Sequence, residues 1–173
     1  KQIQKDGAGQ AEAIAAVRSL EAADPSDLIQ ILQAMNDANP IALNWLRAGY
    51  ESIASKAGKN LPQKELLEFL NQRENLAQAR RLAYETLKSI DPGLEDRLIP
   101  NMLDDPSGEL RRDAVIYTMK QAEKLATDGK KEEAAVQAAS AADVAASAAA
   151  DAASAAATTV DNAASAAAGP VSA

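Results

Sequence analysis

The stretch LIPNMLDDPSGELRRDAVIYTM, from Leu98 to Met119, decides how the whole chain is interpreted. Its centre, Asp104–Ser107, contains a proline, which disfavours helical geometry in the residue before it but is tolerated in the first turn of a helix. We therefore predict that one helix ends at this turn and a second begins there, with Asp105 capping the free N–H groups of the second helix. The stretch is predicted to form a helical hairpin.

Both predicted helices of this hairpin carry an apolar face. Apolar side chains recur every three or four positions, as expected for a helix with one buried side. In the first helix they are Leu94, Leu98, Ile99, Met102 and Leu103, and the second helix carries Leu110, Ala114, Val115, Thr118, Ala122 and Leu125. A single pair of helices would leave half of this apolar surface in water, so we expect further hairpins stacked against it.

Weaker copies of the hairpin are found upstream when one turn position and one helix position are aligned. The turn positions are Pro40, Asn75 and Pro106, and the helix positions are Ala48, Ala83 and Ala114. The successive helix positions are 35 and 31 residues apart, within the range of helical repeats. A small residue at this shared position is expected to let neighbouring helices approach closely.

These residues resemble the HEAT-repeat family, whose pattern is an apolar run with a proline, then Asp-Pro, then an aliphatic residue followed by Arg, and an Ala in the second helix. The matching residues are Leu98-Ile99-Pro100, Asp105-Pro106, Leu110-Arg111 and Ala114. The upstream copies depart from the pattern, because no Arg follows Asn39-Pro40 at the matching place and no Asp-Pro precedes Arg80-Arg81. The resemblance implies an α-solenoid.

Residues 24–128 also resemble the N-terminal helical region of exported bacterial HEAT-repeat proteins whose activity is unassigned. Three stretches carry this second resemblance: ANPIALNWLRAGYESIA (38–54), ARRLAYE (79–85) and DRLIPNMLDDPSGELRRDAV (96–115). The resemblance implies an exported location, periplasmic or at the cell surface, but no reaction. A cytoplasmic location stays open.

The predicted fold is all-α, a short α-solenoid of about three HEAT-like hairpins with an N-terminal capping helix and a long C-terminal Ala-rich helix. Residues 1–9 are predicted to be a flexible lead-in, 10–130 the HEAT-like repeat domain, 131–168 an Ala/Ser-rich helix and 169–173 a tail. The residues predicted to stabilise the stacking of repeats are Pro40, Trp45, Ala48, Arg80, Ala83, Asp105, Pro106, Leu110, Arg111 and Ala114.

Three residue types allow both a structural and a functional interpretation. Trp45, the only Trp of the chain, is interpreted as a buried anchor in preference to a ligand-stacking ring. The pairs Arg80-Arg81 and Arg111-Arg112 could form a ladder that clamps carboxylates, but we favour pairing of Arg with acidic residues between successive repeats. The three tyrosines are expected between helices, with their hydroxyls near water.

Composition argues against several classes of function. The formal charge of −7 and the pI of about 4.7 disfavour nucleic acid as a ligand, since phosphate binding needs a basic surface. The chain contains neither Cys nor His, and therefore lacks a thiol nucleophile, the commonest general base and the commonest metal ligand. No membrane span is predicted, because no run of about 20 strongly apolar residues occurs. No catalytic residue, cofactor or metal site is predicted.

After Glu133 the composition changes abruptly. The remaining residues include no Leu, Ile, Lys, Arg, Glu or aromatic residue and are mainly Ala and Ser. Because Ala has the highest helix propensity, we predict a helix over about 131–167, ended by Gly169-Pro170 and roughly 55 Å long. Two sets of residues seven apart mark a small, polar stripe on it: Ser140, Ser147, Ser154 and Asp161, and Val144, Asp151, Thr158 and Ser165.

Three interpretations of this tail stay open. It is a true Ala-rich helix that packs on itself or on another subunit, or a low-complexity linker that happens to be helical. Alternatively, the residues given after about Glu133 reflect only the small size of the side chains, and the true amino acids differ from the printed ones. Mass spectrometry of the isolated protein distinguishes this last case, because peptides matching the tail would exclude it.

Two hypotheses of function remain. The preferred one is a non-catalytic protein–protein interaction or scaffold module, a subunit of a larger assembly, whose partner is another protein subunit or domain. The alternative is the regulatory or substrate-binding portion of a larger enzyme whose catalytic domain lies outside this chain. The first predicts a protein partner that is lost when surface helices are charge-reversed, and the second predicts a separate folded domain beyond residue 173.

Overall fold

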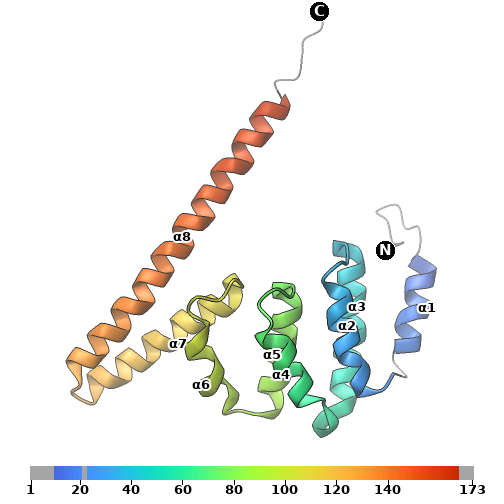
Figure 1. Cartoon of the computed structure of the whole chain (residues 1–173), viewed down its shortest axis with the longest axis horizontal. Helices are drawn as coiled ribbons and strands as arrows, with labels where there is room; N and C mark the ends of the chain where they lie inside the picture. The colour runs from blue at the N-terminus through green and yellow to red at the C-terminus, as the bar shows by residue number, and fades with distance from the viewer. Residues whose placement is uncertain (1–9, 21–22, 168–173) are drawn as a thin grey trace, which may run out of the picture. The chain divides into compact units, whose positions relative to one another are not determined.

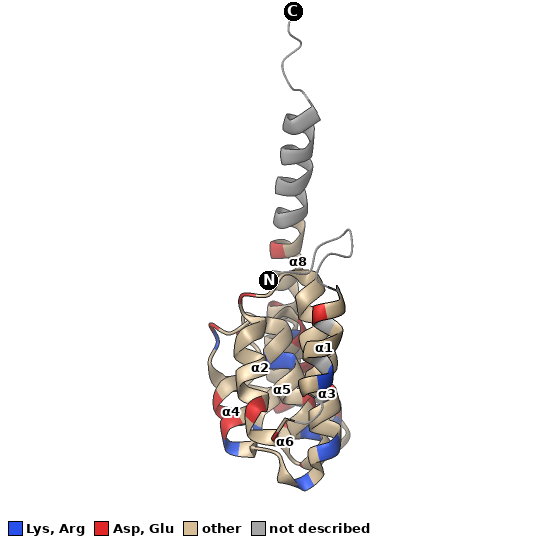
Figure 2. Ribbon diagram, turned by 90° about the vertical axis from the view of Figure 1, so that its right-hand side faces the viewer, with Lys and Arg blue, Asp and Glu red and all other residues tan. Residues whose placement is uncertain are grey.

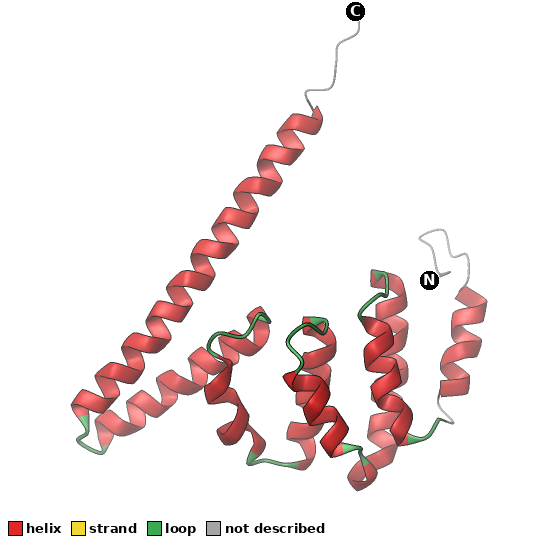
Figure 3. Cartoon of the chain, viewed as in Figure 1, coloured by secondary structure: helices red, strands yellow, loops and turns green. Residues whose placement is uncertain are grey.

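The computed structural model describes residues 10–20 and 23–167 of the chain. The predicted lead-in 1–9 and tail 169–173 lie outside the described residues. Every regular element in the described residues is a helix, and no β-strand occurs among them (Figure 3). The predicted all-α class is therefore confirmed.

Contacts divide the chain into two compact units, Lys1–Leu98 (unit 1) and Ile99–Ala173 (unit 2). This boundary differs from the expected one at residue 130, because residues 99–130 pack along the Ala-rich helix and share a unit with it. The predicted solenoid is therefore described below for each unit separately.

The helices of unit 1 are joined by short turns (Figure 1). In chain order they are α1 (Gln10–Leu20), α2 (Leu28–Met35), α3 (Pro40–Ala57), α4 (Gln63–Asn71), α5 (Ala77–Ile90) and α6 (Leu94–Leu98). Two 3-10 turns, η1 (Pro25–Asp27) and η2 (Gly58–Asn60), precede α2 and α4.

Local capping explains where two of these elements begin. Asn39 precedes α3 in extended geometry, and its side chain accepts a hydrogen bond from the backbone N–H of Ala42 at 2.8 Å, while Pro40 occupies the first helical position. At η1 the Asp24 side chain accepts from the Ser26 N–H at 2.9 Å, and the Asp27 side chain accepts from the Asp24 N–H. Both starts are therefore determined by residues adjacent in sequence.

Unit 1 contains two helical hairpins that lie side by side. α2 packs on α3 and α4 packs on α5, while α2 also contacts both α4 and α5, and α1 covers α3. α2 buries one apolar face, since Leu28, Ile31, Leu32 and Met35 are all buried. The second hairpin contributes Leu66, Phe69, Leu70, Leu82, Ala83 and Leu87 to the core. Unit 1 is thus held together by a continuous apolar layer shared by consecutive hairpins.

The repeat of unit 1 has a different register from the predicted one. RAGYESI (47–53) on α3 and RLAYETL (81–87) on α5 match with an offset of 34 residues, which pairs Gly49 with Ala83. Gly49 and Ala83 are buried, whereas Ala48 is exposed. A shift of one residue turns a helical position by about 100°, so Ala48 faces solvent and Gly49 fills the packed position. The expected role of Ala48 in close helix packing is therefore wrong.

Unit 2 is built from a 3-10 helix and two long helices, η3 (Ile99–Met102), α7 (Gly108–Thr127) and α8 (Lys131–Ala167). α7 packs against η3 and along α8 (Figure 1). Gly129 turns the chain between them with a φ of 82°, and the N–H of Lys130 donates to the carbonyl of Leu125 at 2.9 Å. This is the Schellman turn that commonly ends a helix, and it explains the break between α7 and α8.

The turn that begins α7 differs in detail from the expected one. The helix begins at Gly108, and its cap is Ser107, whose side chain accepts from the N–H of Leu110 at 3.4 Å. Asp105 instead folds the preceding turn, because its carboxylate accepts from the N–H of Ser107 at 2.8 Å. The prediction that Asp105 caps this helix is thus wrong, because Ser107 occupies the N-cap position and Asp105 lies before Pro106, outside the helix.

Candidate functional site

The residues predicted to stabilise the repeats fall into three exposure classes. Arg80, Ala83, Asp105, Leu110 and Ala114 are buried, Trp45 and Arg111 are half-buried, and Pro40, Ala48 and Pro106 are exposed. The buried members come from both units, so they form parts of two cores. They do not converge on one site.

Arg80 and Arg111 bind backbone carbonyl groups. The Arg80 side chain is 1% exposed, and its Nε donates to the carbonyl of Leu70 at 2.7 Å. Nη1 of Arg111 donates to the carbonyl of Asp105 at 3.2 Å, where the sequence suggested a carboxylate partner. Both guanidinium groups thus fasten a helix to a preceding turn or helix end, as a structural Arg does.

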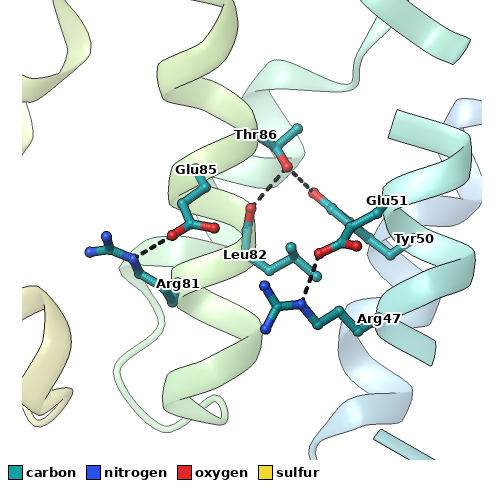
Figure 4. Close-up of polar contacts among 7 residues, drawn as sticks. All are labelled: Arg47, Tyr50, Glu51, Arg81, Leu82, Glu85 and Thr86. Atoms are coloured by element: carbon teal, nitrogen blue, oxygen red, sulfur yellow. Dashed lines mark hydrogen bonds and ion pairs between the residues drawn. The ribbon is translucent and has the colours of Figure 1, made fainter. Parts of the chain in front are cut away.

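A hydrogen-bonded chain connects the two hairpins of unit 1 (Figure 4). The hydroxyl of Tyr50 on α3 donates to Oγ1 of Thr86 on α5 at 3.0 Å, and Oγ1 of Thr86 donates to the carbonyl of Leu82 at 2.8 Å. Tyr50 is fully buried, and burial raises the pKa of its hydroxyl to about 12. The tyrosine hydroxyl that was expected near water is therefore a buried link between hairpins.

The charged side chains of unit 1 are largely engaged with one another. Arg47 pairs with Glu51 and Arg81 with Glu85, each at 2.8 Å and each one helical turn apart (Figure 4). Basic and acidic positions accordingly lie close together on these helices (Figure 2). Such pairs contribute little to stability and neutralise each other, so they do not create a field that would attract a charged ligand.

Unit 2 carries a groove bounded by η3, the turn that follows it, α7 and α8. Its wider part has a volume of about 540 Å³, and its apolar lining is made by Pro100, Leu103, Tyr117, Leu125 and Val136. Thr118, Gln121, Gln137 and Ser140 add neutral polar groups. A narrower part of about 350 Å³ adjoins it and shares Leu103 and Ser140. The whole groove lies within unit 2.

One stripe of α8 forms the rim of this groove. Its residues recur at helical spacing and all are exposed: Val136, Ser140, Asp143, Ser147 and Asp151. Val136 is 71% exposed, the largest exposure of any large apolar side chain in the described residues. The small side chains of this row, Ser140 and Ser147, leave room for the backbone of a second segment to approach α8 closely.

The two ends of the groove differ in charge. No Asp, Glu, Lys or Arg lines the wider part, whereas the narrower part is lined by Asp104, Asp143, Asp151 and one basic residue, Arg111. After Lys131 the helix α8 contains no Lys or Arg, so its aspartates have no basic neighbour on their own helix. The groove therefore has a neutral, largely apolar end and an acidic end.

The shifted ionisable groups of the described surface are explained by local pairs. A hydrogen bond from Arg97 lowers the pKa of Asp91, and a hydrogen bond to Glu95 raises the pKa of Lys88. Hydrogen bonds from Ser26 lower the pKa of Asp24. None of these groups lines the groove, so the shifts reflect turn and surface structure.

The described residues contain no group of three or more Asp, Glu, His or Cys arranged to hold a metal ion. None of their helices combines the length and the apolar character needed to cross a membrane.

Comparison of the chain with known protein families, with characterised proteins and with solved structures finds no match. The class of protein that the fold establishes is all-helical across the described residues. Its function has to be inferred from the groove itself.

The sequence indicated only part of this site. The predicted polar stripe includes Ser140, Ser147, Val144 and Asp151, and the structure brings these four residues to the groove. The sequence-based prediction included neither Val136 as an exposed apolar residue nor the floor of the groove made by Leu103 and its neighbours. A signal was present in the composition, since Val136 is the first of only four large aliphatic residues after Glu133.

Proposed function

We propose that this chain is a non-catalytic protein–protein interaction module built from HEAT-like hairpins, and that the groove of unit 2 is its docking site. The observation that carries the proposal is the groove itself, an open hollow with an apolar floor whose rim exposes Val136 at 71%. Water-exposed apolar side chains beside a concave surface are typical of sites that bury against another protein.

The architecture of unit 1 supports the same proposal. Its consecutive hairpins share one apolar core and leave their outer faces to solvent, which is the arrangement by which helical repeats present surfaces to partners. The solenoid assignment and the resemblance to exported HEAT-repeat proteins belong to this proposal. The proposal includes an exported location, periplasmic or at the cell surface, and only that resemblance supports it.

The proposal also holds that the chain performs no catalysis. Its sequence lacks Cys and His, so a thiol nucleophile and the commonest general base are both missing.

Site-specific photo-crosslinking tests the proposal. A photoreactive amino acid placed at Val136 should produce adducts with another protein in an extract of the native source, because this position lies on the rim of the groove. The matched control is the same substitution at Lys120, an exposed residue of α7 that does not line the groove. Adducts at Val136 and not at Lys120 are expected. Equal labelling at both positions, or no protein adduct at Val136, would contradict a docking role for the groove.

A further inference from the structure

We infer that the groove of unit 2 binds a basic amphipathic helix of a partner protein, with the apolar face of that helix in the wide end and its Lys or Arg residues at the aspartates of the narrow end. This inference rests on the proposed function and adds the chemistry of the partner. It is carried by the length, lining and charge of the groove.

The length of the groove suits a helix of several turns. Its rim on α8 extends from Val136 to Asp151, and fifteen residues at 1.5 Å each span roughly 22 Å. Because the rim follows one straight helix, the most complementary occupant is another straight rod. An amphipathic helix laid in a groove is a recurrent mode of recognition, with anchors at helical spacing.

The lining of the wide end suits apolar anchors. Leu103, Leu125 and Val136 contribute aliphatic surface and Tyr117 an aromatic ring, and no charged side chain interrupts them. Burying an aliphatic side chain there removes apolar surface from water on both partners. The small Ser140 and Ser147 on the rim permit a partner backbone to approach α8 more closely than larger side chains would.

The charge of the narrow end selects the sign of the partner. Asp143 and Asp151 are exposed on the rim, Asp104 lies across from them, and the Arg111 guanidinium is held by the Asp105 carbonyl. Carboxylates that no basic residue of α8 balances favour a cationic segment and penalise an acidic one.

The same charge disfavours the other occupants. A second copy of this chain would present the same aspartates of its own α8, and like charges brought together oppose association. Anionic lipid surfaces and nucleic acids are negatively charged as well, and a chain with a formal charge of −7 is repelled by both. A basic protein segment is the occupant that the charges favour.

Binding of a designed peptide tests the inference. The probe is a labelled peptide of about 16 residues, with Leu on one helical face and Lys on the flanks, long enough to span the groove. Fluorescence anisotropy with the whole chain should show saturable binding that weakens as salt is raised. Circular dichroism should show the peptide becoming helical on binding, because isolated helices of this length are marginal in water.

Charge exchange provides the matched control. Asp143→Lys/Asp151→Lys should weaken binding of the Lys peptide at least tenfold and create binding of the same peptide with Glu in place of Lys. Binding of the Glu peptide also proves that this variant is folded. Glu65→Lys/Glu123→Lys changes the formal charge equally at exposed residues outside the groove, and should alter affinity for the Lys peptide less than twofold.

Two results would overturn the inference. One is a Lys peptide that does not bind the native chain, or that binds the Asp143→Lys/Asp151→Lys variant as tightly as it binds the native chain. The other is an equal loss in the Glu65→Lys/Glu123→Lys variant, which would mean attraction by net charge alone. If crosslinking at Val136 captures a protein while the peptide fails, the docking site stands and the basic helix is wrong. If both fail, the proposed function is wrong as well.

Discussion

The hydrogen bond between Tyr50 and Thr86 offers a quantitative test of how the hairpins of unit 1 are joined. The Tyr50 hydroxyl is fully buried and donates to Thr86 Oγ1 at 3.0 Å, across 36 residues of sequence. Thr86 Oγ1 keeps a second partner, the carbonyl of Leu82. The three changes to compare are Tyr50→Phe, Thr86→Val and the two combined.

The expected costs differ because the groups left behind differ. Tyr50→Phe removes only the donor, and since Thr86 still bonds Leu82, it should cost about 1 kcal/mol of unfolding free energy. Thr86→Val leaves a buried hydroxyl without its acceptor and should cost about 2 kcal/mol. The double variant leaves no polar atom unsatisfied on either side chain. It should therefore cost about 1 kcal/mol and be more stable than Thr86→Val alone, with a coupling of about 2 kcal/mol.

Urea unfolding followed by the fluorescence of Trp45 measures these free energies. Trp45 is the only Trp in the chain and lies on α3, so its emission reports on unit 1. Tyr117→Phe, in unit 2, is the control and should not move this transition. Additive costs for the two substitutions, with the double variant the least stable of the set, would refute the buried hydrogen bond.

Three further predictions concern stability. Because burial raises the pKa of Tyr50 to about 12, the folded chain keeps a proton that the unfolded chain loses above about pH 10. The contribution of this proton to the stability of the folded chain is complete below pH 10 and is lost as the pH rises toward 12. Urea unfolding midpoints measured across this range should show the loss, and Tyr50→Phe should abolish it. Gly129→Ala should cost about 1 kcal/mol in urea unfolding monitored by circular dichroism, because φ at this position is 82°. Gly108→Ala is the control and should be neutral or stabilising. An added Cβ meets nothing within 4 Å at either position, so the difference between the two variants reports the backbone angle. Arg80→Ala should cost about 3 kcal/mol of unfolding free energy by the Trp fluorescence assay, because the side chain is buried. Arg112→Ala, at an exposed position, should change the unfolding free energy by no more than about 0.5 kcal/mol by circular dichroism. Similar costs for the two variants would contradict a buried role for Arg80.

Helix positions could be predicted well from the sequence. The starts at Asn39-Pro40 and at Pro25, the end near Gly58, and the apolar face of α2 all follow from residues a few positions apart. The error at Asp105 shows the limit of this reasoning, because Asp105 and Ser107 are both good caps and only the structure shows that Ser107 caps α7.

The repeat register was only partly readable. The motifs RAGYESI and RLAYETL contain the 34-residue offset, but the alignment anchored on Pro40 and Asn75 places Ala48 one position away from the buried face. Only the packed helices show that Gly49 and Ala83 occupy equivalent positions and that Tyr50 reaches Thr86.

By itself, the sequence determined the all-helical class, the helix limits and the long Ala-rich α8, because capping, proline geometry and helix propensity act over one or two turns of chain. The tertiary structure alone decided which arginines are buried, where Tyr50 bonds, and that Leu103, Val136 and Asp151 border one groove. These depend on how two helix faces turn toward each other, and a rotation of one residue changes every partner while leaving the helical pattern of the sequence unaltered.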